Sequence, residues 1–276
     1  MDGKLKFALR IAGVVLFSLA CWIGGVAIIA GLAGADEMSA GGLGTTPFTA
    51  VLAMMTFIGL AIGPIVGARL FHGWSARDVL GPFDAVRRFG PHALLIAGLA
   101  SVITVGGALL LADLPEPRPL LMWLSFLPAG IAGVLLQTLA EEIAFRGYLL
   151  TALRRFNLPA LGAAALSSLL FAVLHFNGEA TALANLLTIA SIFIFAMCMC
   201  DLTIRSGSIV SAWVMHFCNN AAGILIVSVE GRLSGLSLWV APESMVTEYS
   251  PVNAAFDVAV ILLIWYLIRR RIIRTT

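Results

Sequence analysis

Residues 11–34 read IAGVVLFSLACWIGGVAIIAGLAG, and residues 51–67 read VLAMMTFIGLAIGPIVG. Neither run contains a charged side chain, and an α-helix needs about 17–25 apolar residues to cross the hydrocarbon core of a bilayer. Across the 276 residues, 60% are hydrophobic, 12% are charged, and the mean hydropathy is +1.00. A soluble domain carries roughly 25% charged residues. The composition therefore excludes soluble, disordered and collagen-like proteins and predicts an integral membrane protein.

The apolar runs predict an all-α, polytopic membrane helix bundle of about eight transmembrane helices. Strands of a membrane β-barrel alternate apolar and polar residues over about 10 positions, whereas these runs are unbroken. Pro128 predicts that the regular part of the fourth helix begins there, with residues 119–127 near the interface. No connecting stretch is long enough for a second domain, so we expect residues 1–276 to form a single integral membrane domain. The predicted spans cover residues 9–33, 48–70, 92–112, 121–150, 159–178, 182–200, 206–229 and 252–268.

The basic residues predict the orientation of these spans. If the N-terminus is cytoplasmic, the outside loops hold only Arg118 and Arg232. Basic residues favour the cytoplasmic side of a membrane, so we expect both termini to be cytoplasmic. The inside segments then hold Lys4, Lys6, Arg10, Arg69, Arg77, Arg87, Arg88, Arg154, Arg155, Arg205, Arg269, Arg270, Arg271 and Arg274.

The net charge and the cysteines indicate which partners and which covalent cross-links to expect. The formal net charge is only +2, which predicts no nucleic-acid partner. The cysteines all lie in apolar segments, where we expect small core residues rather than disulfides. They are Cys21, Cys198, Cys200 and Cys218.

Polar residues within the spans mark the candidate site, because inserting an ionisable residue at bilayer depth costs roughly 2.5–3.5 kcal/mol. They concentrate on the fourth, fifth and seventh spans, whose helices we expect to bring them together. These residues are Glu141, Glu142, Arg146, His175, His216, Asn219, Asn220 and Asp257.

The fourth span carries two adjacent glutamates. Glu142 and Arg146 are four residues apart, so they share a helix face and we expect them to pair. Glu141 lies about 100° around the helix and has no partner in its own segment. The alternative is an ordinary charged helix end at the headgroups, but Arg154 and Arg155 mark that end better.

Two other four-residue spacings lie on the fifth and seventh spans. Phe171 and His175 share a helix face, as do His216 and Asn220. An imidazole and an amide can both present hydrogen-bond donors to one point. Asn219 points elsewhere, and we expect it to form a hydrogen bond between helices.

Together these helices predict one pocket that holds a carboxylate, two imidazoles and an amide. This set suits activation of water and stabilisation of an oxyanion. It also suits zinc, for which Glu141, His175 and His216 would be the ligands. At about 1.5 Å per residue, Glu141 and His216 lie at compatible depths, whereas His175 lies somewhat too far toward the outside.

In this order on separate spans, the three motifs resemble the CPBP family of intramembrane proteases, also called the ABI domain, which includes the type II CAAX prenyl endopeptidases. Glu-Glu-x-x-x-Arg is matched by Glu141, Glu142 and Arg146, Phe-x-x-x-His by Phe171 and His175, and His-x-x-x-Asn by His216 and Asn220. The resemblance covers residues 125–225, a protease-like catalytic core.

The resemblance implies a role for each motif residue. Glu141 and His175 would activate the attacking water, and His216 and Asn220 would stabilise the tetrahedral oxyanion. Glu142, Arg146 and Phe171 would be structural. The metalloprotease and the metal-free descriptions of this family both remain open for these residues.

The expected function is hydrolysis of a peptide bond at or within the membrane, with membrane lipid and a membrane-bound or lipidated peptide as partners. CAAX processing follows from the family name alone. The short chain favours a prokaryotic plasma membrane. A proton-coupled transporter and a non-catalytic membrane binder of the immunity or scaffold type are the alternatives, since buried Glu and His are also common in proton pathways.

Overall fold

The computed structural model describes residues 3–34, 44–111, 114–231 and 233–275. A helix occupies the position of every predicted span. These helices are α1 (Gly3–Ala33), α3 and α4 (Pro47–Met55 and Phe57–His72), α6 (Ala85–Leu111), α7 (Leu120–Glu142), α9 (Ala160–Val173), α10 (Ala182–Ser206), α11 (Val210–Ala221) and α13 (Pro251–Thr275). The shorter elements are α5 (Ala76–Leu80), η1 (Ile143–Leu149), α8 (Leu150–Arg155), η2 (Ala222–Ile226), β1 (Val227–Val229), η3 (Ser234–Leu236), β2 (Trp239–Ala241) and α12 (Ser244–Thr247).

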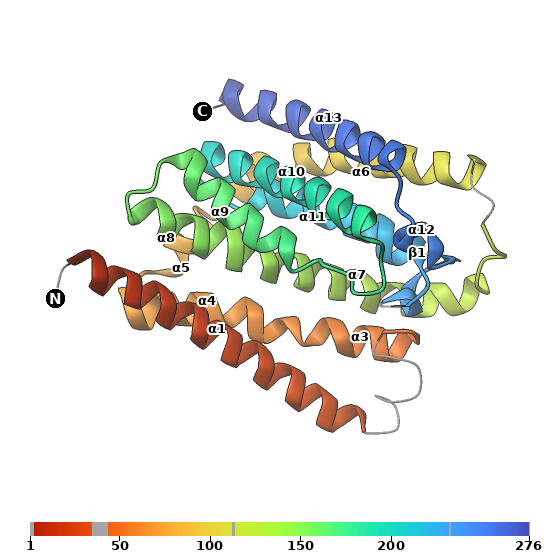
Figure 1. Cartoon of the computed structure of the whole chain (residues 1–276), viewed down its shortest axis with the longest axis horizontal. Helices are drawn as coiled ribbons and strands as arrows, with labels where there is room; N and C mark the ends of the chain where they lie inside the picture. The colour runs from red at the N-terminus through yellow and green to blue at the C-terminus, as the bar shows by residue number, and fades with distance from the viewer. Residues whose placement is uncertain (1–2, 35–43, 112–113, 232, 276) are drawn as a thin grey trace.

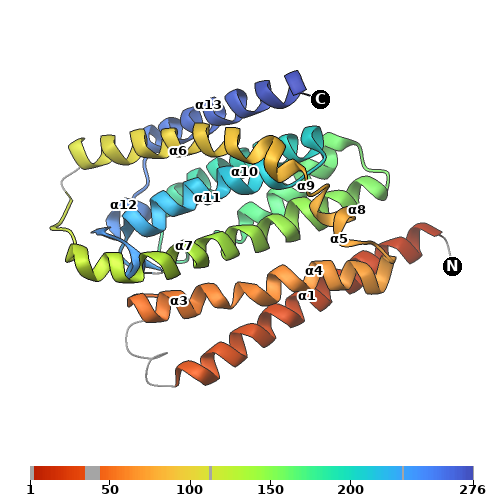
Figure 2. The ribbon, with the colours of Figure 1, turned by 180° about the vertical axis from the view of Figure 1, so that it is seen from behind.

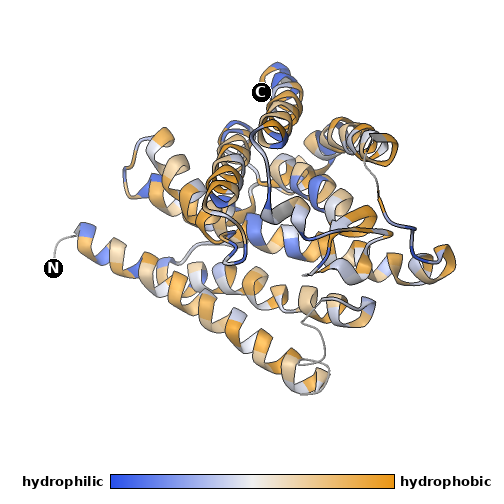
Figure 3. Cartoon of the chain, turned by 45° about the vertical axis from the view of Figure 1, so that its right-hand side comes forward, coloured by the Kyte–Doolittle hydropathy of each residue, from blue (hydrophilic) through white to orange (hydrophobic). Residues whose placement is uncertain are grey.

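The chain is a polytopic helical membrane protein. In the described part of the chain, six helical segments are long and apolar enough to cross a membrane, and two shorter apolar helices, Ala160–Val173 and Val210–Ile226, complete the set. Most of the helical ribbon is hydrophobic (Figure 3), and many of its large apolar side chains are exposed. Leu110 and Leu121 are 86% and 83% exposed, which is favourable only if lipid covers them.

Figures 1 and 2 show the helices in layers, with α1 and α4 on one side, α13 and α6 on the other, and α10 and α11 between them. Helix α11 packs against α6 and α7, and α10 packs against α9 and α13. Both termini lie at the same end of the bundle (Figure 1). This arrangement agrees with an even number of passes.

Helix α4 packs closely against α1 because two glycines of α4 face α1. A Cβ atom added at Gly59 would lie 2.2 Å from the carbonyl oxygen of Cys21, and one added at Gly63 would lie 2.7 Å from the Cα of Ser18. Small residues at membrane helix interfaces allow backbones to approach and gain van der Waals contact. The four-residue spacing of these glycines therefore fixes how α1 joins the bundle.

Local signals set the ends of α10, which carries part of the site. The Thr181 side chain accepts a hydrogen bond of 3.1 Å from the backbone N–H of Ala184, which satisfies a free donor at the helix start. The helix ends at Ser206 and is capped by Gly207, whose φ of 67° is left-handed and costs glycine no steric energy.

The structure corrects several predicted boundaries. Helix α7 begins at Leu120 and runs through Pro128, so the regular helix does not start at the proline. Helix α9 ends at Val173, and residues 227–229, predicted as helix, form β1, which pairs in parallel with β2. Arg232, predicted in an outside loop, lies outside the described residues.

The cysteine prediction is largely confirmed. All four cysteines are free thiols, and three of them are buried; Cys21 is only half-buried, because α1 lies at the edge of the bundle.

Candidate active site

The helix that carries Glu141 and Glu142 changes its geometry directly after them. Helix α7 ends at Glu142 and continues without a break into η1, a π-helical turn that contains Arg146. Helix α11 likewise continues into the π-helical segment η2 shortly after Asn220. Such wide turns are rare and occur mostly at functional sites.

Glu142 and Arg146 form the ion pair that their spacing predicts. Glu142 Oε1 lies 3.1 Å from Arg146 Nη1, and neither side chain is exposed. A buried ion pair of this kind is costly to break, because removal of one partner leaves an uncompensated charge.

His216 lies between the two glutamates. The sequence does not predict its contact with Glu142. Its Nδ1 donates a hydrogen bond of 2.8 Å to Glu142 Oε1, and its Nε2 lies 3.5 Å from Glu141 Oε2. The imidazole is only 3% exposed. Because the Glu142 carboxylate accepts a hydrogen bond from the Nδ1–H group, it fixes the orientation of the ring and directs Nε2 toward Glu141.

A chain of three amides connects the other side of Glu141 to α11. Asn219 Nδ2 donates to Asn220 Oδ1 at 3.1 Å, and Asn220 Nδ2 donates to Gln137 Oε1 at 3.0 Å. Gln137 Nε2 then donates to Glu141 Oε1 at 2.7 Å. Each amide nitrogen carries two N–H groups, so Asn220 keeps one donor for another acceptor.

Two residues of this amide chain differ from what the sequence predicts. Gln137 was not predicted as a site residue, although it precedes Glu141 by four residues and thus shares its helix face. Asn219 was expected to bond between helices, but its side chain bonds to Asn220 on the same helix, because it is exposed at the edge of a cavity.

Phe171 packs against four side chains of the site. Its ring centroid lies 4.8 Å from that of His175 and 6.0 Å from that of His216. The Arg146 guanidinium carbon lies 4.3 Å from its centroid, and Phe145 packs edge-on at 5.1 Å. Phe171 is 2% exposed, so its buried ring packs against Arg146 and supports both imidazole rings.

His175 lies in the turn after α9 rather than on the helix. Its Nδ1 lies 2.9 Å from the carbonyl oxygen of Phe171, and the residue is exposed. A carbonyl can only accept, so neutral His175 donates from Nδ1 and presents Nε2 as an acceptor. Among the hydrogen bonds of the described residues, none joins His175 to Glu141.

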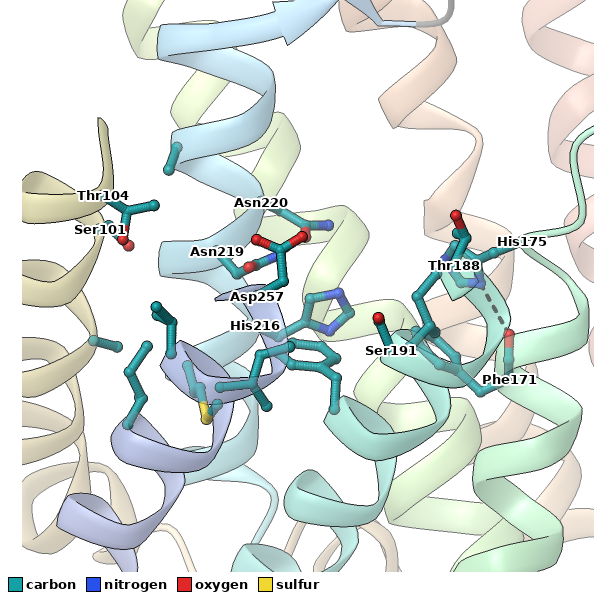
Figure 4. A pocket seen from close by; sticks show the side chains of 18 of the residues that line it. Ser101, Thr104, Phe171, His175, Thr188, Ser191, His216, Asn219, Asn220 and Asp257 are labelled. Carbon is teal, nitrogen blue, oxygen red and sulfur yellow. Dashed lines mark hydrogen bonds between the residues drawn. The ribbon is translucent and has the colours of Figure 1, made fainter. Parts of the chain in front are cut away.

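His175 and His216 both line a cavity of about 420 Å³ between α6, α9, α10, α11 and α13. Figure 4 shows His216, Asn219 and Asn220 together with His175 and with Asp257 of α13. Glu141 is not among the described residues that line the cavity. It adjoins His216, which does line it, and is linked to Asn220 through Gln137. The cavity thus exposes two imidazoles and two amides, with a carboxylate directly behind them.

The donors are not arranged as a metal site. Within residues 3–34, 44–111, 114–231 and 233–275, no group of three His, Cys, Asp or Glu side chains converges on a point where an ion could bind. Glu141 and His216 approach one another, but His175 Nδ1 is held at the Phe171 carbonyl. The three predicted ligands therefore do not fit a zinc ion in this arrangement.

Two comparisons with known proteins bear on this site. The chain matches none of the curated proteins with which it was compared. A family model described as "Type II CAAX prenyl endopeptidase Rce1-like" matches residues 122–222, which include every motif residue from Glu141 to Asn220. This match confirms the resemblance of the segment to the CPBP family of type II CAAX prenyl endopeptidase-like proteins that its three motifs predict.

Proposed function

We propose that this chain is an intramembrane endopeptidase that hydrolyses a peptide bond of a membrane-bound substrate at the cavity. The observation that carries the proposal is the contact of Glu141 with both His216 and, through Gln137, Asn220. A carboxylate that is hydrogen-bonded to amides and adjoins an imidazole at a cavity wall suits general-base hydrolysis. The family match in the same segment supports it.

In the proposed reaction, Glu141 removes a proton from a water molecule, and the hydroxide oxygen attacks the scissile carbonyl carbon. His175 assists because its Nε2 is free to accept a hydrogen bond from that water. The free N–H of Asn220 stabilises the oxyanion, as does His216 when its ring carries a second proton, on Nε2, and is an imidazolium. The proton held by Glu141 then passes to the leaving amine as the C–N bond breaks.

Glu142 and Arg146 position His216 rather than touch the substrate. The Glu142 carboxylate holds Nδ1 of the imidazole, and Arg146 balances the carboxylate charge inside the bundle. The protein thereby keeps His216 in one orientation while the oxyanion forms and collapses. The proposed steps use only side chains of this chain and need no metal ion.

We further propose CAAX-type processing of a lipidated, membrane-bound peptide, because the matching family description names prenyl endopeptidases. A location in a prokaryotic plasma membrane with both termini cytoplasmic is part of the same proposal. It is supported by the basic residues of the inside segments and by the position of both termini at one end of the bundle.

The test is reconstitution of the full chain in proteoliposomes with a library of prenylated and unmodified peptides, followed by mass spectrometry of the products. We expect cleavage by the wild type and a loss of kcat of about 10²–10⁴-fold in Glu141→Gln, which still accepts the Gln137 hydrogen bond. Glu243→Gln, at an exposed position away from the network, is the control.

Other outcomes would assign a different function. Equal cleavage by wild type and Glu141→Gln overturns the proposed role of Glu141. A pH-dependent flux through the vesicles without product peptides would indicate the proton-coupled carrier, and retained biological function in Glu141→Ala without either activity would indicate a non-catalytic binder.

A further inference from the structure

Two aspartates lie on the apolar helices α10 and α13, and their surroundings differ. Asp201 is compensated, since its carboxylate lies 2.7 Å from Arg205 Nε and 3.1 Å from Arg269 Nε, and it accepts a hydrogen bond of 3.0 Å from Trp265 Nε1. Asp257 forms no ion pair with any arginine or lysine of the described segments. Its one hydrogen bond to a side chain in that part of the chain comes from the Tyr249 hydroxyl.

Asp257 is exposed and lines the same cavity as His216 and His175 (Figure 4). It comes from α13, whereas the two histidines come from α11 and from the turn after α9. The Asp257 carboxylate thus lies on a different wall of the cavity from the proposed catalytic groups. No step of the proposed hydrolysis uses this carboxylate.

Tyr249 shows which group donates in this pair. Burial, together with the neighbouring Asp257, raises the pKa of the Tyr249 hydroxyl, so the phenol keeps its proton at neutral pH. The hydroxyl therefore donates to Asp257 Oδ2, and the carboxylate is the acceptor. The other oxygen, Oδ1, is left to accept a hydrogen bond from something that enters the cavity.

We infer that Asp257 is a specificity-determining residue that binds a cationic nitrogen of the peptide substrate close to the scissile bond. This inference rests on the proposed function and names the substrate class: a membrane-bound peptide that carries an ammonium or guanidinium group.

The chemistry of the cavity supports a cation rather than a neutral group. An ionised carboxylate only accepts hydrogen bonds, and its attraction to a positive charge is strengthened where water is scarce. Ser191 and Thr188 of α10 add hydroxyl oxygens to the lining. A volume of about 420 Å³ is within the usual range for ligand pockets and accommodates a lysine or arginine side chain beside the peptide backbone.

The experiment compares pairs of N-acetylated peptides that differ only by Lys or norleucine at one position, scanned along both sides of the cut. Full-length protein in proteoliposomes is assayed for kcat and KM on each pair. We expect the wild type to prefer the Lys peptide at least tenfold in kcat/KM at one position, mainly through KM. Asp257→Asn brings the ratio of the two peptides to within twofold of unity, and Asp257→Glu retains a preference.

Two variants separate charge from structure. Asp201→Asn changes an aspartate whose charge is already compensated, so the preference stays as in the wild type. Tyr249→Phe removes the hydroxyl but keeps the carboxylate, so it retains a preference for Lys. An unchanged preference in Asp257→Asn, or equal cleavage of both peptides by the wild type, overturns the inference.

Two further arms identify the source of the charge and separate the two proposals. Peptides with a free N-terminus and no Lys show whether an α-ammonium replaces the side chain. Binding of the same Lys and norleucine peptides to the Glu141→Gln variant is measured without turnover. Suppose that no peptide is cleaved, but that Glu141→Gln binds the Lys peptide at least tenfold more tightly than the norleucine peptide. If the double variant Glu141→Gln with Asp257→Asn loses this preference, the proposed hydrolysis fails while the cation site stands. Equal binding of both peptides overturns the cation site.

Discussion

The Nδ1–H of His216 on α11 donates a hydrogen bond of 2.8 Å to the carboxylate of Glu142 on α7. The second glutamate of the motif is thereby a positioning residue for His216, in addition to its pairing with Arg146. A carboxylate in this place keeps the tautomer and stabilises positive charge on the ring.

Glu142→Gln is expected to lower kcat by on the order of 10–100-fold, with a smaller change in KM, because the amide keeps the acceptor oxygen but removes the charge behind His216. The pH profile of kcat should also shift, which a purely structural defect would not cause. The measurement is peptide turnover in proteoliposomes, with the exposed Glu248→Gln as control. Unchanged kcat and pH profile in Glu142→Gln would contradict the positioning role.

Arg146→Met is expected to destabilise the fold by about 3–5 kcal/mol, because it leaves the fully buried Glu142 without its counter-charge. The double variant Glu142→Gln with Arg146→Met should lose less than the sum of the single losses. Thermal or denaturant unfolding in detergent measures these free energies. Additive losses would show that the two side chains are not coupled.

Gln137→Met is expected to lower kcat about tenfold, because methionine cannot hold Asn220 and Glu141 in their relative orientation. The effect should be smaller than that of Asn220→Ala, which removes the proposed oxyanion donor, a kind of group worth about 10²–10³-fold. Ser125→Ala, an exposed position on the same helix, is the matched control. Wild-type turnover in Gln137→Met would remove the amide chain from the mechanism.

Gly63→Ala is expected to destabilise the protein by about 1–3 kcal/mol, since the added methyl group would meet the α1 backbone at Ser18. Gly98→Ala on α6 adds the same methyl group where no atom lies within 4 Å, and it should leave the melting temperature unchanged or slightly raised. Equal melting temperatures of the two variants would refute the close packing of α1 on α4.

Removal of divalent metals is expected to leave turnover unchanged, because the described His, Cys, Asp and Glu side chains form no three-donor cluster. The assay compares protein before and after dialysis against a chelator, with the residual metal content measured by mass spectrometry. Lost activity that returns on addition of Zn²⁺ would instead support Glu141, His175 and His216 as ligands in a rearranged site.

The fold follows closely from sequence, because the signals that specify membrane helices are local. The apolar runs located the six long and two shorter apolar helical segments found among the described residues, and the four-residue spacing of Glu142 and Arg146 correctly predicted their ion pair. The end of α9 was not predictable from hydropathy, since Leu174 and Phe176 continue the apolar run on either side of His175.

The contacts that assemble the candidate site were harder to predict, because they join residues far apart in sequence. Glu142 and His216 are 74 positions apart, and their hydrogen bond depends on how α7 and α11 are rotated. Gln137 escaped notice for another reason: it is neutral, so no insertion cost marked it. Its four-residue spacing from Glu141 was the one available signal.

The π-helical turn η1 also affects how this segment could change in evolution. Such a turn holds one residue more than regular helix, yet α7 and α8 continue from its two ends as one rod. Deleting a single residue between Ile143 and Leu149 would let the rod become regular without rotating either flank. Such a deletion would change the angle around the helix between Glu142 and Arg146, so the geometry of this motif and the membrane architecture are separable by one codon.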